Sequence, residues 1–317
     1  MRTMNVNKTG VVTAMLVALS GCAAMPGTPP GLREVGMERA DVPPRKDWVE
    51  GQRVKVVVGA PEGDWPAARQ AQLVPLLSQA VQQAIEESGS EVVDRSLNTS
   101  LKNEMRLAEA RGSGNFDGPA VAHFAVRPGF SKVSVNSIRE ERGMLSKLIK
   151  KNEPPTYDHR LVVEGRIRVY EIPSMRLVET LQFKEEHKEE NTSPQMPDAN
   201  AKLREAFEKA YGRVRGDFRN LIAPRGAIVK KGIAEGGTFF QAMMGRDHKL
   251  TPRAKVKIYS YRGGQETLVA EASVSKYIAA HSCWISVDDA KAVGRIREGD
   301  IARLAIDESM LGKLKVW

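Results

Sequence analysis

The chain has 317 residues, of which 41% are hydrophobic and 27% charged, and its formal net charge at pH 7 is +9. This composition is typical of a soluble globular protein with room for about two domains, and it excludes fibrous and integral helical membrane proteins. The positive charge is modest and spread along the chain, so no nucleic-acid partner is expected. The two cysteines, Cys22 and Cys283, are too few for a disulfide framework or a four-ligand metal site.

The N-terminus has the pattern of a signal peptide, predicted over residues 1–21. A basic start at Arg2 and Lys8 precedes an apolar run from Val11 to Leu19, which is too short to span a bilayer. The residues Leu19-Ser20-Gly21-Cys22 resemble the bacterial lipobox, in which small residues precede a cysteine that is joined to diacylglycerol. This resemblance implies lipidation of Cys22. An ordinary secretory peptide cleaved nearby is the alternative.

A lipidated Cys22 would anchor the protein durably, because each buried CH₂ group of an acyl chain contributes about 0.8 kcal/mol. Ala23, in place of Asp, favours the outer membrane by the convention for enteric bacteria, with the folded part facing the periplasm. Residues 22–51 are rich in proline and glycine and poor in apolar residues. They predict a flexible tether that reaches about 30 Å and lets the folded part hang clear of the membrane.

Residues 52–223 are predicted to form a domain that starts with strands and helices in alternation. Apolar residues recur at helical spacing from Leu73 to Ile85, which predicts a helix that ends at Gly89, with Pro75 near its start or at a kink. The elements expected here are strands at Arg53–Gly59 and Glu91–Ser96 and helices at Leu73–Gly89 and Leu97–Arg111.

The second half of this domain is predicted to be a set of strands closed by a helix. Alternating apolar and polar residues predict a hairpin whose turn lies at Ile172–Met175. The elements are strands near His123–Val135, at His159–Tyr170 and at Met175–Phe183, and a helix at Pro197–Leu221. This order predicts a mixed sheet covered by helices, which places the domain in the α+β class as a mixed α/β sandwich.

Residues 224–317 change in composition to short strands and turns, which predict a small all-β, barrel-like domain. Cys283 is expected to be an unpaired, buried residue beside Trp284. The predicted strands lie at Ala227–Lys230, Phe239–Met243, Ala254–Tyr259, Leu268–Tyr277, Cys283–Val287 and Ile301–Ala305.

Two resemblances follow from these segments. The strand Val54–Val58, the helix, and the run Glu91-Val92-Val93-Asp94-Arg95-Ser96 leading into Leu101-Lys102-Asn103-Glu104 resemble the CsgG-like lipoproteins of curli secretion and the N-terminal domain of TolB. The C-terminal part, with Gly226-Ala227-Ile228-Val229 and Glu298-Gly299-Asp300, is similar to the small β-domain that ends the flagellar H-ring protein FlgT.

The CsgG-like resemblance implies a pore made of two hairpins per subunit, each with strands of roughly 9–11 residues that alternate apolar and polar side chains. The matching insertions here are Ser137–Tyr157 and Lys184–Asn200. The first spaces its apolar residues as a helix does and ends in Pro154-Pro155, and the second has almost no apolar residues. We therefore do not expect a pore.

The residues show no pattern of catalysis or cofactor binding. The glycine pairs Gly112-Ser113-Gly114 and Gly236-Gly237 lack phosphate-loop spacing and indicate turns. The five histidines are scattered, so neither a metal nor another cofactor is expected. The run Glu185–Glu190 reads as a solvated strand edge rather than an acid-base cluster. We expect a protein that is not an enzyme.

One segment suggests a contact surface. From Ile138 to Lys151 an apolar stripe is accompanied by basic residues and predicts a basic amphipathic helix that binds an anionic membrane or a partner groove. An ordinary helix packed on the domain's own sheet is the alternative. The basic residues are Arg139, Arg142, Lys147, Lys150 and Lys151.

Together these features predict an outer-membrane lipoprotein that acts as an assembly or scaffold component in the periplasm, within a secretion or surface-appendage machine. Its expected partners are the membrane, other envelope proteins and further copies of itself. The alternative is a CsgG-type secretion-channel subunit that forms an oligomeric outer-membrane pore.

Overall fold

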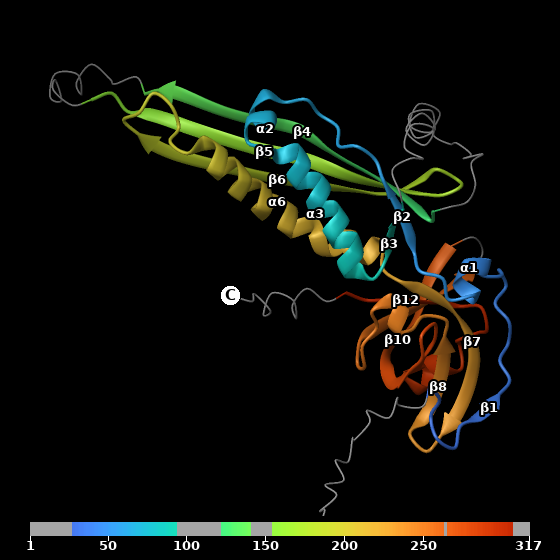
Figure 1. Cartoon of the computed structure of the whole chain (residues 1–317). Coiled ribbons are helices and arrows are strands. Elements are labelled where there is room, and N and C mark those ends of the chain that lie inside the picture. Colours follow the sequence, from blue (N-terminus) through green and yellow to red (C-terminus); the bar gives the residue numbers. More distant parts are fainter. Residues whose placement is uncertain (1–26, 94–121, 141–153, 263–264, 307–317) are drawn as a thin grey trace, which may run out of the picture.

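A computed structural model describes residues 27–93, 122–140, 154–262 and 265–306, and it contains two separate sheets (Figure 1). The first sheet has five strands in the order β3-β2-β4-β5-β6. Its strands are β2 (Lys55–Val58), β3 (Glu91–Val93), β4 (Phe124–Arg139), β5 (Tyr157–Glu171) and β6 (Arg176–Asn191). The strand β2 runs parallel to β3 and β4, whereas β4, β5 and β6 are antiparallel, so the predicted mixed sheet is confirmed.

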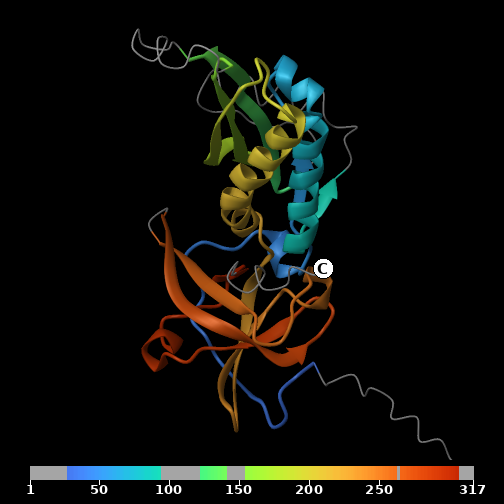
Figure 2. The same cartoon turned by 90° about the vertical axis from the view of Figure 1, so that its left-hand side faces the viewer.

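The helices that the structure describes in this unit lie on one side of the sheet, as Figure 2 shows. They are α2 (Pro66–Gln70), α3 (Leu73–Ser88) and α6 (Ala199–Leu221). Helix α3 begins two residues before Pro75, where the missing N–H costs nothing, and ends at Gly89, whose φ of +92° few other residues adopt. The expectations for both long helices are thus confirmed, and Pro75 lies at a helix start.

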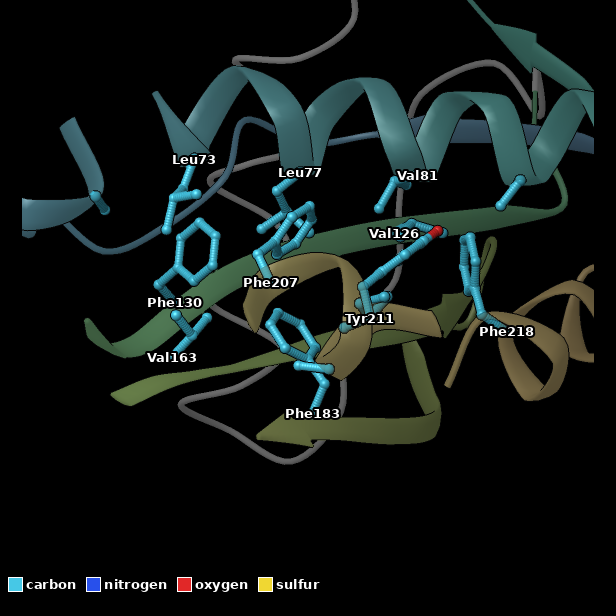
Figure 3. Close-up of a cluster of buried hydrophobic side chains, with 14 of the residues drawn as sticks. Leu73, Leu77, Val81, Val126, Phe130, Val163, Phe183, Phe207, Tyr211 and Phe218 are labelled. Carbon is cyan, nitrogen blue, oxygen red and sulfur yellow. The ribbon is translucent and has the colours of Figure 1, made fainter. Parts of the chain in front are cut away.

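The core of this unit lies between the helices and the sheet (Figure 3). Leu73, Leu77 and Val81 point from α3 toward aromatic rings that come from β4, β6 and α6. The rings of Phe130, Phe183, Phe207 and Tyr211 pack with centroids 5.8–6.5 Å apart, mostly edge to face. Such pairs contribute about 0.5–1.5 kcal/mol each beyond the area that they bury.

The second sheet closes into a six-stranded barrel, because β7 pairs with both β12 and β8 in the order β7-β12-β9-β10-β11-β8. Its strands are β7 (Arg225–Ala234), β8 (Gly237–Ala242), β9 (Lys255–Arg262), β10 (Gln265–Ile278), β11 (Cys283–Ser286) and β12 (Ile301–Leu304). Two short helices, η2 (Arg246–His248) and α7 (Ala290–Val293), lie between strands. The predicted small barrel is confirmed, and Cys283 is unpaired and buried in its core.

The N-terminal segment corrects one expectation. Residues 27–51 do not form a free tether but run along the barrel, where β1 (Arg33–Val35) pairs antiparallel with β7. Further on, the backbone N–H of Ala40 donates to the carbonyl of Glu298 at 2.7 Å, and the helix α1 (Lys46–Val49) buries Trp48. Backbone hydrogen bonds need no apolar side chains, so a segment of low hydrophobicity can still add a strand to an exposed edge.

A second correction concerns the two predicted insertions. Lys184–Asn191 belongs to β6, and Ser137–Arg139 and Tyr157 belong to β4 and β5, so the antiparallel strands are longer than expected. The run Glu185–Glu190 lies on the outer strand of the sheet, as its charge suggested. The helix expected from Ile138 is wrong at its start, because Ile138 and Arg139 are strand residues.

Several expectations fall outside the described residues. These are the signal peptide, Cys22, the end of the second strand at Asp94–Ser96, the helix Leu97–Arg111, the turn at Gly112–Gly114, and the part of the basic segment that contains Arg142, Lys147, Lys150 and Lys151.

A cluster around Arg225 joins the two units. Its guanidinium lies 5.7 Å from the ring centre of Trp48 in α1 and 4.9 Å from that of Phe124 at the start of β4. It also donates to the carbonyl of Leu221 at the end of α6, at 2.6 Å. Burial lowers the pKa of Arg225 to about 9, with the nearby Arg303 acting in the same direction. One side chain thereby contacts both units and the N-terminal segment.

Candidate interaction surface

The side of the five-stranded sheet that faces away from α2, α3 and α6 is the candidate site. Strand register assigns the residues of β4, β5 and β6 to this side, because residues that pair across antiparallel strands share a face. We call it the open face. Its rows, from the barrel outward, are Arg127/Arg168/Thr180, Gly129/Arg166/Gln182, Lys132/Glu164/Lys184, Ser134/Val162/Glu186, Asn136/Arg160/Lys188 and Ile138/Asp158/Glu190.

The open face is long and charged, whereas the opposite side of the same strands forms the core. In β5, the alternate residues Leu161, Val163, Ile167 and Val169 are fully buried under the helices. Strands of 15 and 16 residues extend about 50 Å at 3.3 Å per residue. The sheet therefore extends past its core at the outer end, where residues 157–160 of β5 lie beyond the last core residue, Leu161.

Arginines gather at the end of the open face that lies nearer the barrel. Glu62 binds both Arg127 and Arg168, the latter at 2.9 Å. Burial and the like charge of Arg168 lower the pKa of Arg127, with a smaller contribution from Arg166. Arg166 itself is exposed, as is Lys132 in the next row. The exposed cations Arg166 and Lys132 are therefore the groups at this end of the face that suit an anionic partner group.

Ion pairs continue across the strands farther out. Arg160 lies 2.8 Å from Glu186, which also lies 3.5 Å from Lys188, and Lys184 lies 3.6 Å from Glu164. These pairs are largely exposed, and exposed pairs contribute only about 0–1 kcal/mol to stability. Their value lies in the fixed charge pattern that they present to a partner.

Two exposed apolar side chains mark the ends of this platform. Ile138 is 66% exposed in the outermost row, and Leu177 is 49% exposed beside Tyr170 at the inner end. Val162 lies between them and is 5% exposed. The exposed part of the platform is thus mainly polar between its two apolar ends.

A buried polar network stiffens the outer part of the hairpin from the helix side. His159 is fully buried, with Nδ1 2.7 Å from Ser137 Oγ and Nε2 2.8 Å from Asn191 Oδ1. Each partner comes from a neighbouring strand, so one ring ties β4, β5 and β6 together. With both ring nitrogens engaged, His159 holds the strands in register and is not available to a ligand.

A cavity of about 710 Å³ lies between the sheet unit and the barrel. It is lined by Glu179 and Asp217 of the sheet unit and by Lys255, Lys257, Glu271 and Arg303 of the barrel. Asn220 at its wall pairs with the backbone of Ile306 through both side-chain atoms, at 2.8 and 3.1 Å. Acidic and basic groups face each other across this space without converging on one point, unlike a built ligand site.

The structure separates the residues that the sequence singled out. Arg139 is the exposed last residue of β4, on the helix side of the sheet rather than the open face. Arg142, Lys147, Lys150, Lys151 and Cys22 lie outside the described residues. The residues missed are Arg166, Arg168 and their neighbours, although the alternation of charged with apolar residues along β5 is visible in the sequence and could have indicated a second, polar face.

No group of three or more histidine, cysteine, aspartate or glutamate side chains in the described residues could hold a metal ion. Within the same part of the chain, no helix combines the length and the apolar character needed to cross a membrane.

No protein-family model and no curated protein matches the sequence. Similar solved structures include a neuraminyllactose-binding hemagglutinin homolog from Helicobacter pylori, with 13% identity over 58% of this chain and 90% of that one and a TM-score of 0.34. Lipoprotein GNA1162 from Neisseria meningitidis has 11% identity over 50% and 99%, with a TM-score of 0.25. Rare lipoprotein B from Shewanella oneidensis has 12% identity over 53% and 89%, with a TM-score of 0.21.

Proposed function

We propose that the protein is a non-enzymatic lipoprotein of the bacterial envelope that uses the open face of its sheet to dock an envelope protein. Acyl chains on Cys22 hold it at the outer membrane, and the folded units face the periplasm. Copies of the chain assemble there as a scaffold component of a secretion or surface-appendage machine. The lipobox supports the anchor, and the open face supports the docking role.

The observation that carries the docking role is the contrast between the two sides of β4, β5 and β6. Both sides carry long rows of side chains, but only one side packs against the helices α2, α3 and α6. The other keeps cations such as Lys132 and Arg166 exposed beside ordered ion pairs. A partner with acidic side chains opposite these two cations would gain orientation and rate of association from them.

A photo-crosslinking experiment in cells tests the docking role. A crosslinking amino acid placed at Arg166 should give discrete protein adducts, whereas the same amino acid at Lys209, which is exposed on helix α6, should not. With the crosslinker at Gln182, which lies in the same row as Arg166, the otherwise unchanged chain should give discrete adducts, and the double variant Lys132→Glu, Arg166→Glu should lose them. The matched variant Lys209→Glu should keep them. Equal adducts from both sides of the sheet would contradict the proposal.

The anchor is tested separately by mass spectrometry of the purified N-terminal peptide. The expected product begins at Cys22 and carries the mass of diacylglycerol and a further acyl chain. A free Cys22, or cleavage at another position, would support the ordinary secretory peptide instead.

The second candidate, a CsgG-type secretion-channel subunit, is distinguished by electron microscopy of the detergent-extracted protein. The scaffold proposal predicts particles in which the strands β4, β5 and β6 stay packed against α3 and α6. A ring with a shared membrane barrel would establish the channel and overturn the scaffold.

A further inference from the structure

The position of the first described residues limits how far the folded units can lie from a lipid anchor. Gly27 packs on the barrel, where its Cα faces the side chain of Ala279 closely enough that an added Cβ would lie 3.4 Å from it. Pro29 is buried, and β1 pairs with β7 soon afterwards. Cys22 precedes Gly27 by five residues, so their Cα atoms can be at most about 18 Å apart, whatever the conformation between them.

A reach of that size is shorter than the 30 Å tether expected from the sequence, and it starts from the barrel. The sheet unit, by contrast, extends from the opposite end of the barrel, with the β4–β5 end farthest away (Figure 1). An anchor at Cys22 must therefore bring the barrel to the membrane, whereas the sheet unit can point into the periplasm.

The barrel has a surface suited to that contact. The hairpin of β7 and β8 projects beyond the rest of the barrel, away from the sheet unit, and β1 runs along it (Figures 1 and 2). In this ribbon Arg33 pairs with Ile233 and Val35 pairs with Lys231, so these four side chains share one face. Val35 is 37% exposed and Ile233 is 41% exposed.

Apolar side chains next to a long cationic one are the combination that binds the interface of an anionic bilayer, because such a side chain extends its charge to the headgroups. Arg33 is exposed and can do so, whereas Lys231 is half-buried with its ammonium 5.9 Å from the ring centre of Phe240. On the other side of the ribbon, Glu34 is neutralised by Lys230 at 2.7 Å. Glu235 is exposed at the turn. The ribbon thus keeps a small cationic excess where it is nearest to the anchor.

We infer that the face of the β1–β7 ribbon formed by Arg33, Val35, Lys231 and Ile233 rests on the headgroup layer of the leaflet that holds the acyl chains of Cys22. This inference rests on the proposed lipid anchor and adds an orientation to it. The barrel is the membrane-apposed unit, and the open face of the sheet is presented to partners at a distance from the lipid.

Site-specific fluorescence on the acylated protein tests this inference. The variants Ile233→Cys and Leu177→Cys place a thiol at similarly exposed sites, one on the ribbon and one on the sheet unit. Background labelling should be small, because Cys283 is fully buried and burial raises the pKa of its thiol to about 12. Each labelled variant is reconstituted in vesicles of phosphatidylethanolamine and phosphatidylglycerol that contain a nitroxide-headgroup lipid.

The expected result is quenching at least threefold stronger at position 233 than at position 177. Equal quenching, or stronger quenching at position 177, in protein that floats with the vesicles would overturn the orientation and leave the anchor intact. Protein that does not float with the vesicles would overturn the anchor, and the orientation with it. Mass spectrometry of Cys22 in the same sample confirms which case applies.

Discussion

A buried histidine at the junction of the two units makes the stability of the fold depend on pH. His123 is 3% exposed, and its Nδ1 accepts a hydrogen bond from the backbone N–H of Lys55 at 3.0 Å. Its Nε2 lies 3.2 Å from a carboxylate oxygen of Asp47 in α1. Protonation of the imidazole would add a hydrogen to Nδ1, the nitrogen that accepts this bond, and set it against the N–H of Lys55. Burial, aided by the charge of Arg45 and opposed by Asp47, lowers the pKa of His123 to about 4 from an ordinary value of 6.5.

This lowered pKa predicts a loss of stability in mild acid. Between pH 6.5 and pH 4, residue His123 binds a proton in the unfolded chain but stays neutral in the folded protein. The free energy of unfolding therefore falls as the pH is lowered through that window. The loss amounts to about 3 kcal/mol, because one pKa unit corresponds to about 1.4 kcal/mol. Urea unfolding at a series of pH values measures it.

Two variants isolate the contribution of His123. In His123→Asn the amide oxygen can accept the Lys55 hydrogen bond but does not titrate, so its stability should vary less between pH 4 and pH 6.5. His187→Asn, at an exposed position of β6, should follow the wild-type curve. If His123→Asn and wild type lose stability in parallel, the buried imidazole is not the cause.

At the level of elements, a glycine sets the packing of the central strands. Gly165 of β5 is paired with Phe130 of β4 and with Phe183 of β6, and the ring of Phe183 lies over it on the helix side. A Cβ on Gly165 would lie 2.3 Å from the Phe183 ring and 2.6 Å from the backbone oxygen of Gly129. The ring has no space to retreat, since Phe183 is buried among Phe207 and Tyr211.

The substitution Gly165→Ala should therefore destabilise the sheet unit by about 1–3 kcal/mol, the usual cost of overpacking a core. Urea unfolding followed by far-UV circular dichroism measures the change. Gly212→Ala is the matched control, because an added Cβ in the middle of α6 meets nothing within 4 Å and improves helix propensity. It should be neutral or stabilising by up to about 1 kcal/mol. Equal effects of the two substitutions would contradict the packing argument.

The elements also show which parts of the fold the sequence could predict. Helix α3, helix α6 and the barrel strands follow from periodicity, because each buries its own regularly spaced apolar residues. Lys184–Asn191 has no such spacing and becomes a strand through its neighbours. There, Glu185 meets Arg213 of α6, Glu189 meets Lys202, and Glu186 on the other face meets Arg160. Partners from distant parts of the sequence cannot be read from a local run of charges.

The candidate surface was only partly predictable for the same reason. The alternation in β5 separates Arg166 and Arg168 from Val163 and Ile167, so two unlike faces can be seen in the sequence. The sequence does not show which of these faces the helices cover, because that depends on strand register. Nor does it show that Glu62 contacts Arg127 and Arg168, because that contact depends on a β-bridge between Glu62 and the distant Gly129. Similarly, β1 pairs with the part of β7 that extends past β12, and this edge exists only once β7 and β12 have paired.

At the level of the whole molecule, Trp48 connects the N-terminal segment to both units. It is 7% exposed, packs against Ala227 and Ile301 of the barrel, and lies against the guanidinium of Arg225, which in turn covers Phe124 of the sheet unit. Each unit has its own hydrophobic core, so their cooperation in unfolding depends on this junction. The orientation that carries the open face away from the membrane depends on it too.

The substitution Trp48→Ala should cost about 3–5 kcal/mol, the range for removing a large buried aromatic side chain, and should uncouple the two units. We expect urea unfolding to split into two transitions, and small-angle scattering of the folded variant to show a broader range of interunit distances than wild type. Val49→Ala, at a neighbouring side chain that is 40% exposed, should change neither measurement, because it leaves the contacts of Arg225 in place. A single transition with the wild-type scattering profile in Trp48→Ala would mean that other contacts hold the units together. The barrel could then keep its place at the membrane without fixing the direction of the sheet.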